Sequence, residues 1–358
     1  MQSLDEKKRD IFEVVGKKGL FSVEKQSIKL SEQDLSGTGQ IPVFSSQTSN
    51  NGVMGFTNKV ANFFIKDTPA LIFGDHTKSM DISNHSFCTA DNVKVLRPHN
   101  IPFDALLYVS CAWKKRIPDM GYSRHWRKAK KVGIELPVTD SGEPDYEYMA
   151  AYVQQKRDAM LAKYRAYVEE RIAELGEAVE IPALDEKEWN EYALEELFSV
   201  GAGKRLTNAD KIDGNRPFVG ATDNSNGITG FVGNRNTSCD KNVLGVNYNG
   251  APCIAFYHPY ECIFTDDVKR LHLLHHKDNE YVLLFFKVIV MQQRTKYSYG
   301  YKFKEKRMLR QKLMLPVDDD GKPDYAYMEQ YVKNMMLRKY KQYLAFIDKQ
   351  NAAEEVTV

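Results

Sequence analysis

The amino-acid sequence predicts an α+β protein with two α/β domains, each followed by one long helix, and with the two helices packed antiparallel as a spacer. Three features lead to this prediction. A polar, glycine-containing loop occurs twice, a Leu-Pro-Val segment occurs twice, and a long apolar stripe at helical spacing follows each copy of that segment. Halves that repeat in this way are expected to be related by a pseudo-twofold axis.

The repeat covers most of the chain. GQIPVFSSQTSNNGVMGF (39–56) corresponds to GNRPFVGATDNSNGITGF (214–231), 175 positions later. GIELPVTDSGEPDYEYMAAYV (133–153) corresponds to KLMLPVDDDGKPDYAYMEQYV (312–332), 179 positions later, so the second half contains an insertion between these segments. Matches of this length, in the same order, are not explained by chance similarity.

Each half is predicted to begin with short strands. PALIF (69–73), KNVLGV (241–246), TADNVKVL (89–96) and its counterpart TDDVKRL (265–271) contain the β-branched or aromatic residues typical of strands. Turn residues are concentrated between these stretches. The two halves are therefore expected to share one arrangement of strands.

A helix start is predicted after each Leu-Pro-Val. Pro144 and Pro323 cannot continue a preceding helix, and Asp145 and Asp324 can accept hydrogen bonds from the first free amides. Each helix then runs for about 25 residues or more without proline, which is roughly 35 to 45 Å. Packing of each helix on its own domain alone stays open as an alternative. The stripes are Met149, Val153, Met160, Tyr164, Val168, Ile172 and Leu175, and then Met328, Val332, Met336, Tyr340, Leu344 and Ile347.

Composition limits the classes of function. The 358 residues, 42% of them hydrophobic and 27% charged, suffice for two globular domains. A net charge of +2 excludes a uniformly basic coat for nucleic acid, so an acidic partner must bind local clusters. The five cysteines form no C-x-x-C pair, which makes structural zinc improbable and is typical of reduced, mostly buried thiols. MQSLDEKKRDIF has no signal-peptide core and no run of about 18 apolar residues occurs, so we expect a cytoplasmic protein without a membrane partner.

Two matching segments concentrate positive charge. KKRIPDMGYSRHWRKAKK (114–131) and RTKYSYGYKFKEKRMLRQK (294–312) each carry about eight Lys or Arg against one acid, with aromatic residues between them. Such clusters in a near-neutral protein indicate a surface for a polyanion. A solvated basic face is the alternative, and the aromatic residues can equally belong to the core.

The repeated loops carry short polar side chains of the kind that contact base edges and phosphates. Gly52, Gly55, Gly227 and Gly230 allow positive φ and close approach of the backbone. GAGKRLT (201–207) adds a glycine-rich turn with two cations and lacks the spacing of a nucleotide P-loop. A hairpin connection without a ligand stays open as the alternative.

Catalytic and metal centres are not predicted. Asp145 and Asp324 of the Pro-Asp-Tyr elements, with Asp185-Glu186-Lys187, could suggest a metal nuclease. The second copy offers Asp348-Lys349 without the needed spacing, and both Pro-Asp-Tyr elements lie where a helix cap is expected. The histidines nearest to one another lack the H-E-x-x-H pattern of a catalytic zinc site; they are His272, His275 and His276.

Together these residues resemble the specificity (S) subunits of bacterial restriction-modification systems, of Type I and of the related bipartite Type IIB enzymes. The resemblance covers nearly the whole chain and depends on the repeated G-x-x-P-[VF]-[VF] loop, on the Gly-Tyr and basic segment that leads to L-x-L-P, and on the duplicated helix. LPVDDDGKPDYAYMEQYV departs from the short Leu-Pro-rich phrase that ends Type I recognition domains. It is closer to Type IIB or methyltransferase-fused relatives, so the type of system stays open.

The resemblance implies two target recognition domains that read the two half-sites of a split double-stranded DNA sequence. It further implies spacer helices that dock DNA adenine methyltransferase subunits, with restriction subunits as further partners, and a non-catalytic subunit without cofactor or metal in a bacterium or archaeon. Helices short for Type I suggest a modest gap, with half-site centres about 10 base pairs apart. The expected parts are recognition domains 1–144 and 189–322, spacer helices 145–178 and 323–358, and linker 179–188.

The residues expected to contact DNA come from the repeated loops, the glycine-rich turn and the basic segments. In the first half they are Ser45, Ser46, Gln47, Asn50, Asn51, Lys114, Lys115, Tyr122, Arg124, Arg127 and Lys128. In the second half they are Lys204, Arg205, Thr222, Asn224, Asn226, Arg294, Lys296, Tyr299, Tyr301 and Lys302. A duplicated protein-protein scaffold and a fragment of a fused methyltransferase-endonuclease are the competing hypotheses.

Overall fold

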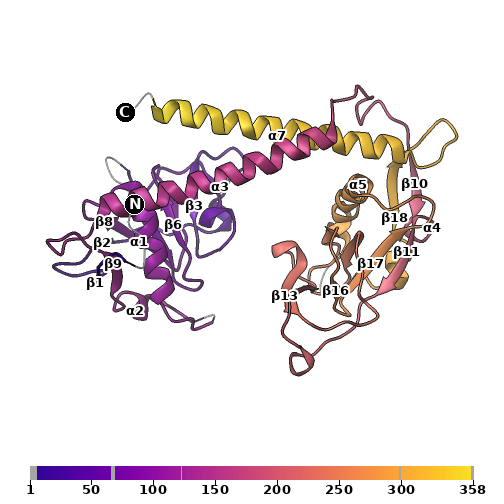
Figure 1. Cartoon of the computed structure of the whole chain (residues 1–358). Coiled ribbons are helices and arrows are strands. Elements are labelled where there is room, and N and C mark those ends of the chain that lie inside the picture. Colours follow the sequence, from indigo (N-terminus) through magenta and orange to yellow (C-terminus); the bar gives the residue numbers. More distant parts are fainter. Residues whose placement is uncertain (1–5, 66–68, 122, 298–299, 356–358) are drawn as a thin grey trace. The chain divides into compact units, whose positions relative to one another are not determined.

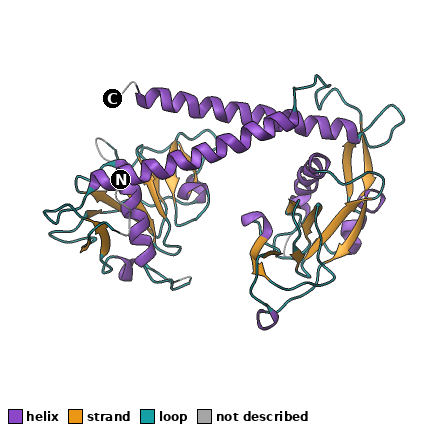
Figure 2. Ribbon diagram, in the orientation of Figure 1, coloured by secondary structure: helices purple, strands orange, loops and turns teal. Residues whose placement is uncertain are grey.

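The computed structural model describes residues 6–65, 69–121, 123–297 and 300–355, with side chains to residue 349 (Figure 1). The chain forms two compact units, Met1–Tyr164 (unit 1) and Arg165–Val358 (unit 2), and the boundary falls inside helix α3 (Tyr146–Leu175). Figure 2 shows the same mixture of short strands, connecting loops and helices in each unit. The predicted mixed architecture is confirmed.

Unit 1 contains nine strands and two further helices among its described residues. The strands are β1 (Arg9–Phe12), β2 (Phe21–Glu24), β3 (Ile41–Phe44), β4 (Val53–Thr57), β5 (Ala70–Gly74), β6 (Met80–Ser83), β7 (Cys88–Thr89), β8 (Val93–Pro98) and β9 (Ile134–Pro137). The helices are α1 (Phe103–Arg116) and α2 (Trp126–Ala129).

Unit 2 repeats this order of strands and adds a short helix after its first strand. Its strands are β10 (Trp189–Ala193), β11 (Phe198–Ala202), β12 (Arg216–Val219), β13 (Ile228–Val232), β14 (Val243–Asn247), β15 (Ala255–His258), β16 (Ile263–Phe264), β17 (Val268–Leu273) and β18 (Lys312–Pro316). Its helices are α4 (Leu194–Leu197), α5 (Glu280–Met291), α6 (Glu305–Leu309) and α7 (Tyr325–Glu355).

The sheets of the two units have the same topology. Unit 1 has the strand orders β2-β8-β5-β6, β4-β3-β7 and β1-β9, and unit 2 has β11-β17-β14-β15, β13-β12-β16 and β10-β18. The pairs β3-β7 and β12-β16 are parallel, and the other pairs are antiparallel. Even the register shift repeats, at Val43/Phe44 and at Phe218/Val219. The repeat in the sequence is therefore a repeat of fold.

The main core of each unit lies between the four-stranded sheet and one helix. In unit 1, α1 buries Leu106, Val109 and Trp113, and Trp113 stacks on Phe73 of β5 with ring centroids 5.5 Å apart. In unit 2, α5 takes the same place. These two helices are absent from the sequence-based expectation, although the apolar positions of α1 already have helical spacing.

Helices α3 and α7 begin at Tyr146 and Tyr325, as predicted. The carboxylate of Asp145 accepts from the amide of Tyr148, and that of Asp324 accepts from the amide of Tyr327, both at 2.9 Å. These bonds satisfy amides that have no partner within the helix, which explains why the Pro-Asp pair starts it.

Within unit 2, the end of α3 runs antiparallel to α7. Arg165 forms an ion pair with Asp348 at 2.5 Å, and the ring of Tyr167 meets that of Tyr340 edge to face. Further along, the backbone of Val179 exchanges two hydrogen bonds with the side chain of Asn334. From Arg165 to Val179, residues further along the chain thus contact residues of α7 that lie earlier in the sequence, as in antiparallel segments. The two bonds of Val179 also hold the linker against α7.

The stripe on α3 is not uniformly buried. Met149 and Val168 are fully buried, whereas Met160 is 71% exposed. Met160 therefore departs from the expectation of one packed stripe, because it borders an open groove instead. Over the described residues, no helix is long and apolar enough to cross a membrane. The cysteines are free thiols, with Cys88, Cys253 and Cys262 buried, Cys239 half-buried and Cys111 exposed.

Candidate nucleic-acid interface

The two repeated loops have one backbone conformation. We call residues 45–52 polar loop 1 and residues 220–227 polar loop 2. The amide of Ser45 donates to the carbonyl of Gly52, and the amide of Gly220 donates to that of Gly227, both at 2.8 Å. The last three residues of each loop all have positive φ: Asn50, Asn51 and Gly52, and then Ser225, Asn226 and Gly227. Asn and Gly tolerate this region best, which explains the residue types that repeat.

The side chains of polar loop 1 are divided between structure and solvent. Gln47 donates to the carbonyl of Val53 at 2.7 Å, so its amide holds the loop closed. Ser46 accepts from the amide of His76 at 3.0 Å, which joins the loop to the β5-β6 turn. Asn50 and Asn51 are exposed and Ser45 is half-buried. Of the predicted residues, the two asparagines are therefore the most available to a ligand.

Polar loop 2 is built on the corresponding turn of unit 2. Asn247, at the end of β14, donates to the carbonyl of Thr222 at 2.9 Å. Thr222 also accepts from the amide of Asn224 at 3.3 Å. Asn224 and Asn226 are exposed, and the side chain of Asn226 makes a hydrogen bond to Tyr260.

The β5-β6 turn also joins polar loop 1 to the first basic segment (114–131). Asp75 accepts from the amide of Trp126 at 2.6 Å through its carboxylate, and from the amide of His125 at 2.8 Å through its carbonyl. Lys78 of the same turn makes a second contact with the basic segment, because its ammonium lies 3.5 Å from the carboxylate of Asp119. Loop, turn and basic segment therefore form one continuous surface in unit 1.

A basic hollow of about 500 Å³ lies at this place. Its lining includes Arg124, Arg127 and Lys128 of the predicted set, together with Lys94, which is not in that set. Lys114 also lies near polar loop 1. Burial raises the pKa of Asp81, and the charge of Lys114 acts in the opposite direction. Asp81 borders the loop, because a Cβ on Gly52 would lie 2.5 Å from its carboxylate.

Lys115 is placed on another surface. It lines a groove between α1 and α3 with its neighbour Arg116, away from the hollow formed by 124–128. Consecutive residues of a helix project about 100° apart, so Lys114 and Lys115 cannot serve the same face equally. Lys115 therefore lies on a different surface from the basic hollow, and its contact with DNA stays a prediction.

The second basic segment (294–312) approaches polar loop 2 at its start. The guanidinium of Arg294 lies 3.8 Å from the carboxylate of Asp223, and both side chains are about half exposed. Lys296 is exposed and donates to Gln293 at 2.7 Å. Tyr301 is half exposed and lies under the guanidinium of Arg307 at 3.9 Å, while Lys302 is half-buried.

Lys204 and Arg205 are exposed beside polar loop 2. The amide of Lys204 donates to the carbonyl of Phe264, at the end of the strand that pairs with β12. Gly203 is required here for packing, because a Cβ would lie 1.9 Å from the carbonyl oxygen of Thr265. Packing against Thr265 thus explains the glycine at this position of the turn. The turn places Lys204 and Arg205 at the end of the sheet from which polar loop 2 begins.

Most interleaved aromatic residues belong to the core. His125 and Phe303 are buried, and Trp126 packs against Phe73. Burial raises the pKa of Tyr297 to about 12, since the phenolate would lose its hydration. The predicted contacts Tyr122 and Tyr299 lie outside the described residues. Tyr301 is the one described aromatic residue of the predicted set.

The Pro-Asp-Tyr elements have a structural role in both units. Lys7 pairs with Asp145 at 2.7 Å and Lys187 pairs with Asp324 at 2.9 Å, while both aspartates cap a helix. Asp324 and Lys187, two of the nuclease candidates, are therefore engaged with each other as a helix cap and its counter-ion, and Asp145 is engaged in the same way with Lys7. Among the described residues, no group of three His, Cys, Asp or Glu is arranged to hold a metal ion.

Three residues that contribute to this surface are not among those predicted from the sequence. His76 and Asn247 support the polar loops, and Lys94 adds a cation to the hollow. Lys94 and Lys269 occupy the same place in the repeated Thr-Asp-x-Val-Lys stretches, so the repeat contained a signal for them. In unit 2, Lys269 is engaged with Glu305.

Comparison with known proteins agrees with this architecture. The family described as "Type I restriction modification DNA specificity domain" matches residues 186–343. A protein from Heyndrickxia coagulans, named "Type II restriction enzyme BgcI specificity subunit S.BcgI", is 38% identical over 270 residues, which are 75% of this chain and 77% of the relative.

Two solved structures are also similar. The Type-I restriction-modification system S subunit from M. genitalium is 16% identical with a TM-score of 0.47, over 99% of this chain and 96% of its own. The HsdS subunit from Thermoanaerobacter tengcongensis is 12% identical with a TM-score of 0.33, over 78% and 75%. Likenesses at these scores add no weight of their own. By its sequence identity to the Heyndrickxia coagulans protein, the chain belongs to the specificity-subunit family of restriction-modification systems.

Proposed function

We propose that the chain reads a split double-stranded DNA sequence, one half-site per unit, and directs a DNA adenine methyltransferase to it without catalysing a reaction itself. Residues 1–144 and 189–322 act as the recognition domains, 145–178 and 323–358 as spacer helices, and 179–188 as the linker. The relative from Heyndrickxia coagulans is named as a Type II subunit, which favours a bipartite Type II system over Type I.

The observation that carries the proposal is the repeated assembly of a polar loop, a supporting β-turn and a basic segment. Each unit closes its loop with an equivalent backbone bond and supports it from the turn after β5 or β14. The asparagines of both loops are exposed, and so are Arg124 and Arg127 in unit 1 and Arg294 and Lys296 in unit 2. Cations that neutralise phosphates supply affinity, and short amides supply base-specific hydrogen bonds.

Selection from a duplex library with a randomised region tests this proposal. The purified chain, alone and with its methyltransferase, would be used to capture duplexes at about 0.1 M salt, where phosphate contacts are strong. Two short blocks of fixed sequence at a constant separation, with centres about 10 base pairs apart, are the expected result. Captured duplexes without any shared sequence would contradict specific reading, and a single block would contradict the bipartite target.

A further inference from the structure

The basic hollow of unit 1 contains cations without ion-pair partners. Its lining includes four of them, which are Lys94, Arg124, Arg127 and Lys128. Among the described residues, no carboxylate forms an ion pair with any of the four. The acid of the same lining, Asp75, already accepts from the amide of Trp126 at 2.6 Å. The hollow therefore offers an excess of positive charge to an anion that approaches from solvent.

Backbone hydrogen bonds identify the equivalent place in unit 2. The amide of Lys128 donates to the carbonyl of His125 at 3.0 Å. In the second basic segment the amide of Arg307 donates to the carbonyl of Lys304 at 2.8 Å. These two bonds are 179 positions apart in the chain, as are the two Leu-Pro-Val segments. The two basic segments can therefore be compared residue by residue.

Most of the free charge is missing at this place in unit 2. Phe303, which is buried, stands where unit 1 has Arg124. Lys269, the equivalent of Lys94, forms an ion pair with Glu305, and the side chain of Lys269 is only 11% exposed. A cation that is both covered and paired cannot approach a phosphate without losing these contacts.

The other two equivalents in unit 2 differ from each other. The guanidinium of Arg307 lies 3.9 Å from the centre of the Tyr301 ring and donates to the carbonyl of Lys302 at 2.9 Å. Lys306, the equivalent of Arg127, is exposed and has no ion-pair partner over the residues that the structure describes. At these four positions of the described chain, unit 2 thus keeps one cation unengaged, whereas unit 1 keeps four.

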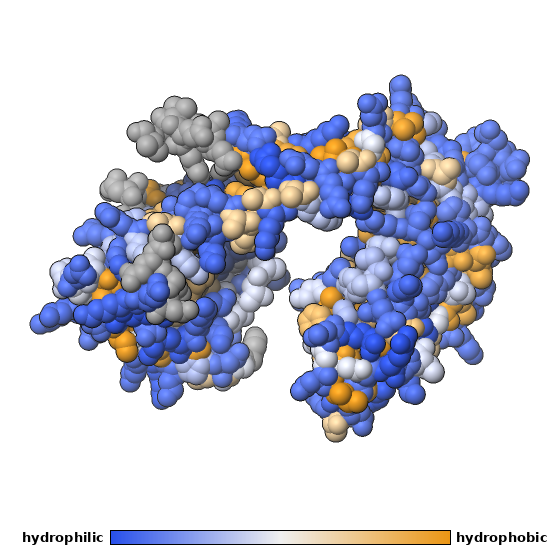
Figure 3. All heavy atoms as spheres, in the orientation of Figure 1, coloured by the Kyte–Doolittle hydropathy of each residue, from blue (hydrophilic) through white to orange (hydrophobic). Residues whose placement is uncertain are grey.

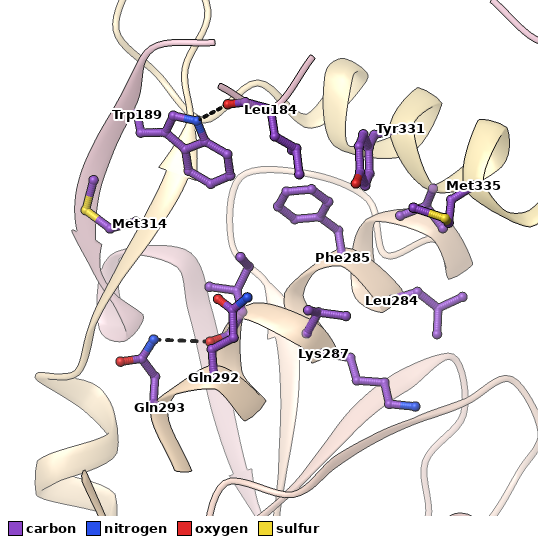
Figure 4. A pocket seen from close by; sticks show the side chains of 13 residues that line it. Leu184, Trp189, Leu284, Phe285, Lys287, Gln292, Gln293, Met314, Tyr331 and Met335 are labelled. Carbon is purple, nitrogen blue, oxygen red and sulfur yellow. Dashed lines mark hydrogen bonds between the residues drawn. The ribbon is translucent and has the colours of Figure 1, made fainter. Parts of the chain in front are cut away.

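The apolar groove of unit 2 does not replace the hollow. It lies beside α5 and α7 with a volume of about 540 Å³, and Figure 4 shows the ring of Phe285 between Trp189 and Tyr331. Lys287 is the one cation among its described lining residues, and burial lowers the pKa of that lysine. A lining that is mainly uncharged does not attract a phosphate.

Unit 2 has free cations in the glycine-rich turn instead. Lys204 and Arg205 are exposed there, and neither has an acidic partner in the described part of the chain. The amide of Lys204 donates to the carbonyl of Phe264 at 2.9 Å. In unit 1 the amide of Leu30 donates to the carbonyl of Thr89 at the same distance. A buried leucine of unit 1 therefore takes the place where unit 2 exposes a lysine.

The neighbouring lysine of unit 1 is neutralised. Lys29 precedes Leu30 and forms an ion pair with Asp91 at 2.5 Å, which lowers the pKa of Asp91. The face seen in Figure 3 is mainly hydrophilic, so exposure alone does not distinguish one charged side chain from another. Freedom from an acidic partner does distinguish them. At the two places compared, it selects the hollow in unit 1 and the glycine-rich turn in unit 2.

We propose that the two units hold the phosphates of bound DNA with clusters of cations that are not equivalent, the basic hollow in unit 1 and the glycine-rich turn in unit 2. The inference rests on the proposed function, because that function supplies the DNA. Phosphate contacts fix the register of a protein on the duplex. The phosphates held at one half-site therefore lie at other positions, relative to the bases that are read, than those held at the second half-site.

Ethylation interference tests the positions of these contacts. Target duplex with randomly ethylated phosphates would be bound by the full chain, alone and with its methyltransferase, and the ethylated positions missing from the bound fraction would be mapped. We expect two sets of phosphates, one per half-site, that do not coincide when one half-site is rotated onto the other. Two sets that coincide would overturn the proposal.

Paired substitutions assign each set of phosphates to its cations. Arg124→Ala with Arg127→Ala, and Lys204→Ala with Arg205→Ala, change exposed side chains, so the fold is preserved. Each pair should reduce the slope of log K against log salt by about 2, because two phosphate contacts are lost. The first pair should weaken interference at one half-site only, and the second pair at the other. An unchanged slope in either double variant would overturn the proposal.

The equivalent lysines provide matched controls. Lys306→Ala changes the counterpart of Arg127, and Lys29→Ala changes the cation of unit 1 nearest to the place of Lys204. Both variants should keep the slope of the wild type, since Lys29 is already paired and Lys306 stands without the other cations of the hollow. A slope reduced equally by Lys306→Ala and by Arg127→Ala would contradict the unequal clusters.

The outcomes separate this proposal from the proposed function. A wild-type chain that captures no shared sequence from the duplex library contradicts the reading of DNA itself. A chain that captures a split sequence, but shows coinciding phosphates or equal effects of equivalent substitutions, still reads DNA and refutes only the unequal clusters.

Discussion

The guanidinium of Arg294 lies 3.8 Å from the carboxylate of Asp223, so that an arginine of the second basic segment meets an acid of polar loop 2. Both side chains are about half exposed, and the pair is therefore weak in water. A phosphate of bound DNA would compete with Asp223 for the same cation. The pair thus connects the loop that is proposed to read bases with the segment proposed to hold the backbone.

Substitution of this pair should separate affinity from specificity. We expect Arg294→Ala to weaken binding of target and non-target duplexes alike, and to reduce the slope of log K against log salt by about 1, because one phosphate contact is lost. Asp223→Asn should raise non-specific affinity, since it removes a charge that repels DNA. Fluorescence anisotropy at several salt concentrations measures both effects. Lys341→Ala, an exposed lysine of α7, is the control, and an unchanged slope in Arg294→Ala would exclude the contact.

Loss of a loop amide should change sequence preference instead. Asn224→Ala is expected to relax one base position of one half-site, by about 1–3 kcal/mol of discrimination, with little change in salt dependence. Asn50→Gly makes the corresponding test in unit 1 and retains the positive φ that an alanine would strain. Library selection with each variant reads out the preference. Variants that weaken all sequences equally would show that these amides contact only the backbone of DNA.

The ion pairs of His272 predict a loss of stability at alkaline pH. Its imidazole bonds Asp278 at 2.7 Å and Asp240 at 3.0 Å, and these carboxylates raise the pKa of His272 to about 9. The stabilisation is fully present below the unfolded pKa of about 6.5 and is lost as pH rises through about 9. Urea unfolding should therefore separate wild type from His272→Gln more at pH 6 than at pH 10. A constant difference would contradict the ion pairs.

His258 predicts a loss of stability in acid. It is fully buried, and burial lowers its pKa to about 4, with the charge of Lys287 acting in the same direction. Below about pH 6.5 the imidazole of His258 is protonated in the unfolded chain and stays neutral in the folded chain. The free energy of unfolding therefore falls by up to about 1.4 kcal/mol per pH unit until about pH 4. His258→Phe should remove this dependence. If the unfolding free energies of the two proteins changed equally from pH 7 to pH 4.5, the lowered pKa of His258 would be refuted.

The capping aspartates should matter for stability and not for DNA. We expect Asp324→Ala to cost about 1–2 kcal/mol of unfolding free energy, since it removes both the cap of α7 and the partner of Lys187. Asp319→Ala, an exposed neighbour, is the control and should change little. Thermal unfolding and duplex binding would be measured together. DNA cleavage by the wild-type chain that is lost in Asp324→Ala would instead revive the nuclease hypothesis.

The elements predicted well are those with local causes. The Pro-Asp pairs start α3 and α7 because proline interrupts a preceding helix and aspartate caps a new one. Both effects depend on neighbouring residues only, so they can be predicted from the sequence. Helices α1 and α5 are not among the predicted elements, although the buried positions of α1 have helical spacing. The basic end of α1, Lys114 to Arg116, also belongs to the first basic segment.

The site could be predicted only in part, because side-chain direction is set by packing. Gln47 has the same chemistry as its exposed neighbours, yet its amide closes the loop. Lys114 and Lys115 are adjacent in sequence and lie on different surfaces, one near Asp81 and one in the groove between α1 and α3. The support of polar loop 1 by His76 depends on a contact 30 positions away in the chain, which no local pattern encodes.

Methylation mapping of genomic DNA tests the central claim most directly. Cells that express the methyltransferase with this chain would be compared with cells that express the methyltransferase alone, by modification-sensitive sequencing. The account predicts a split motif that is methylated only when the chain is present, with one half-site altered by Asn50→Gly and the other by Asn224→Ala. Identical methylation with and without the chain would contradict its role as the reader of the sequence.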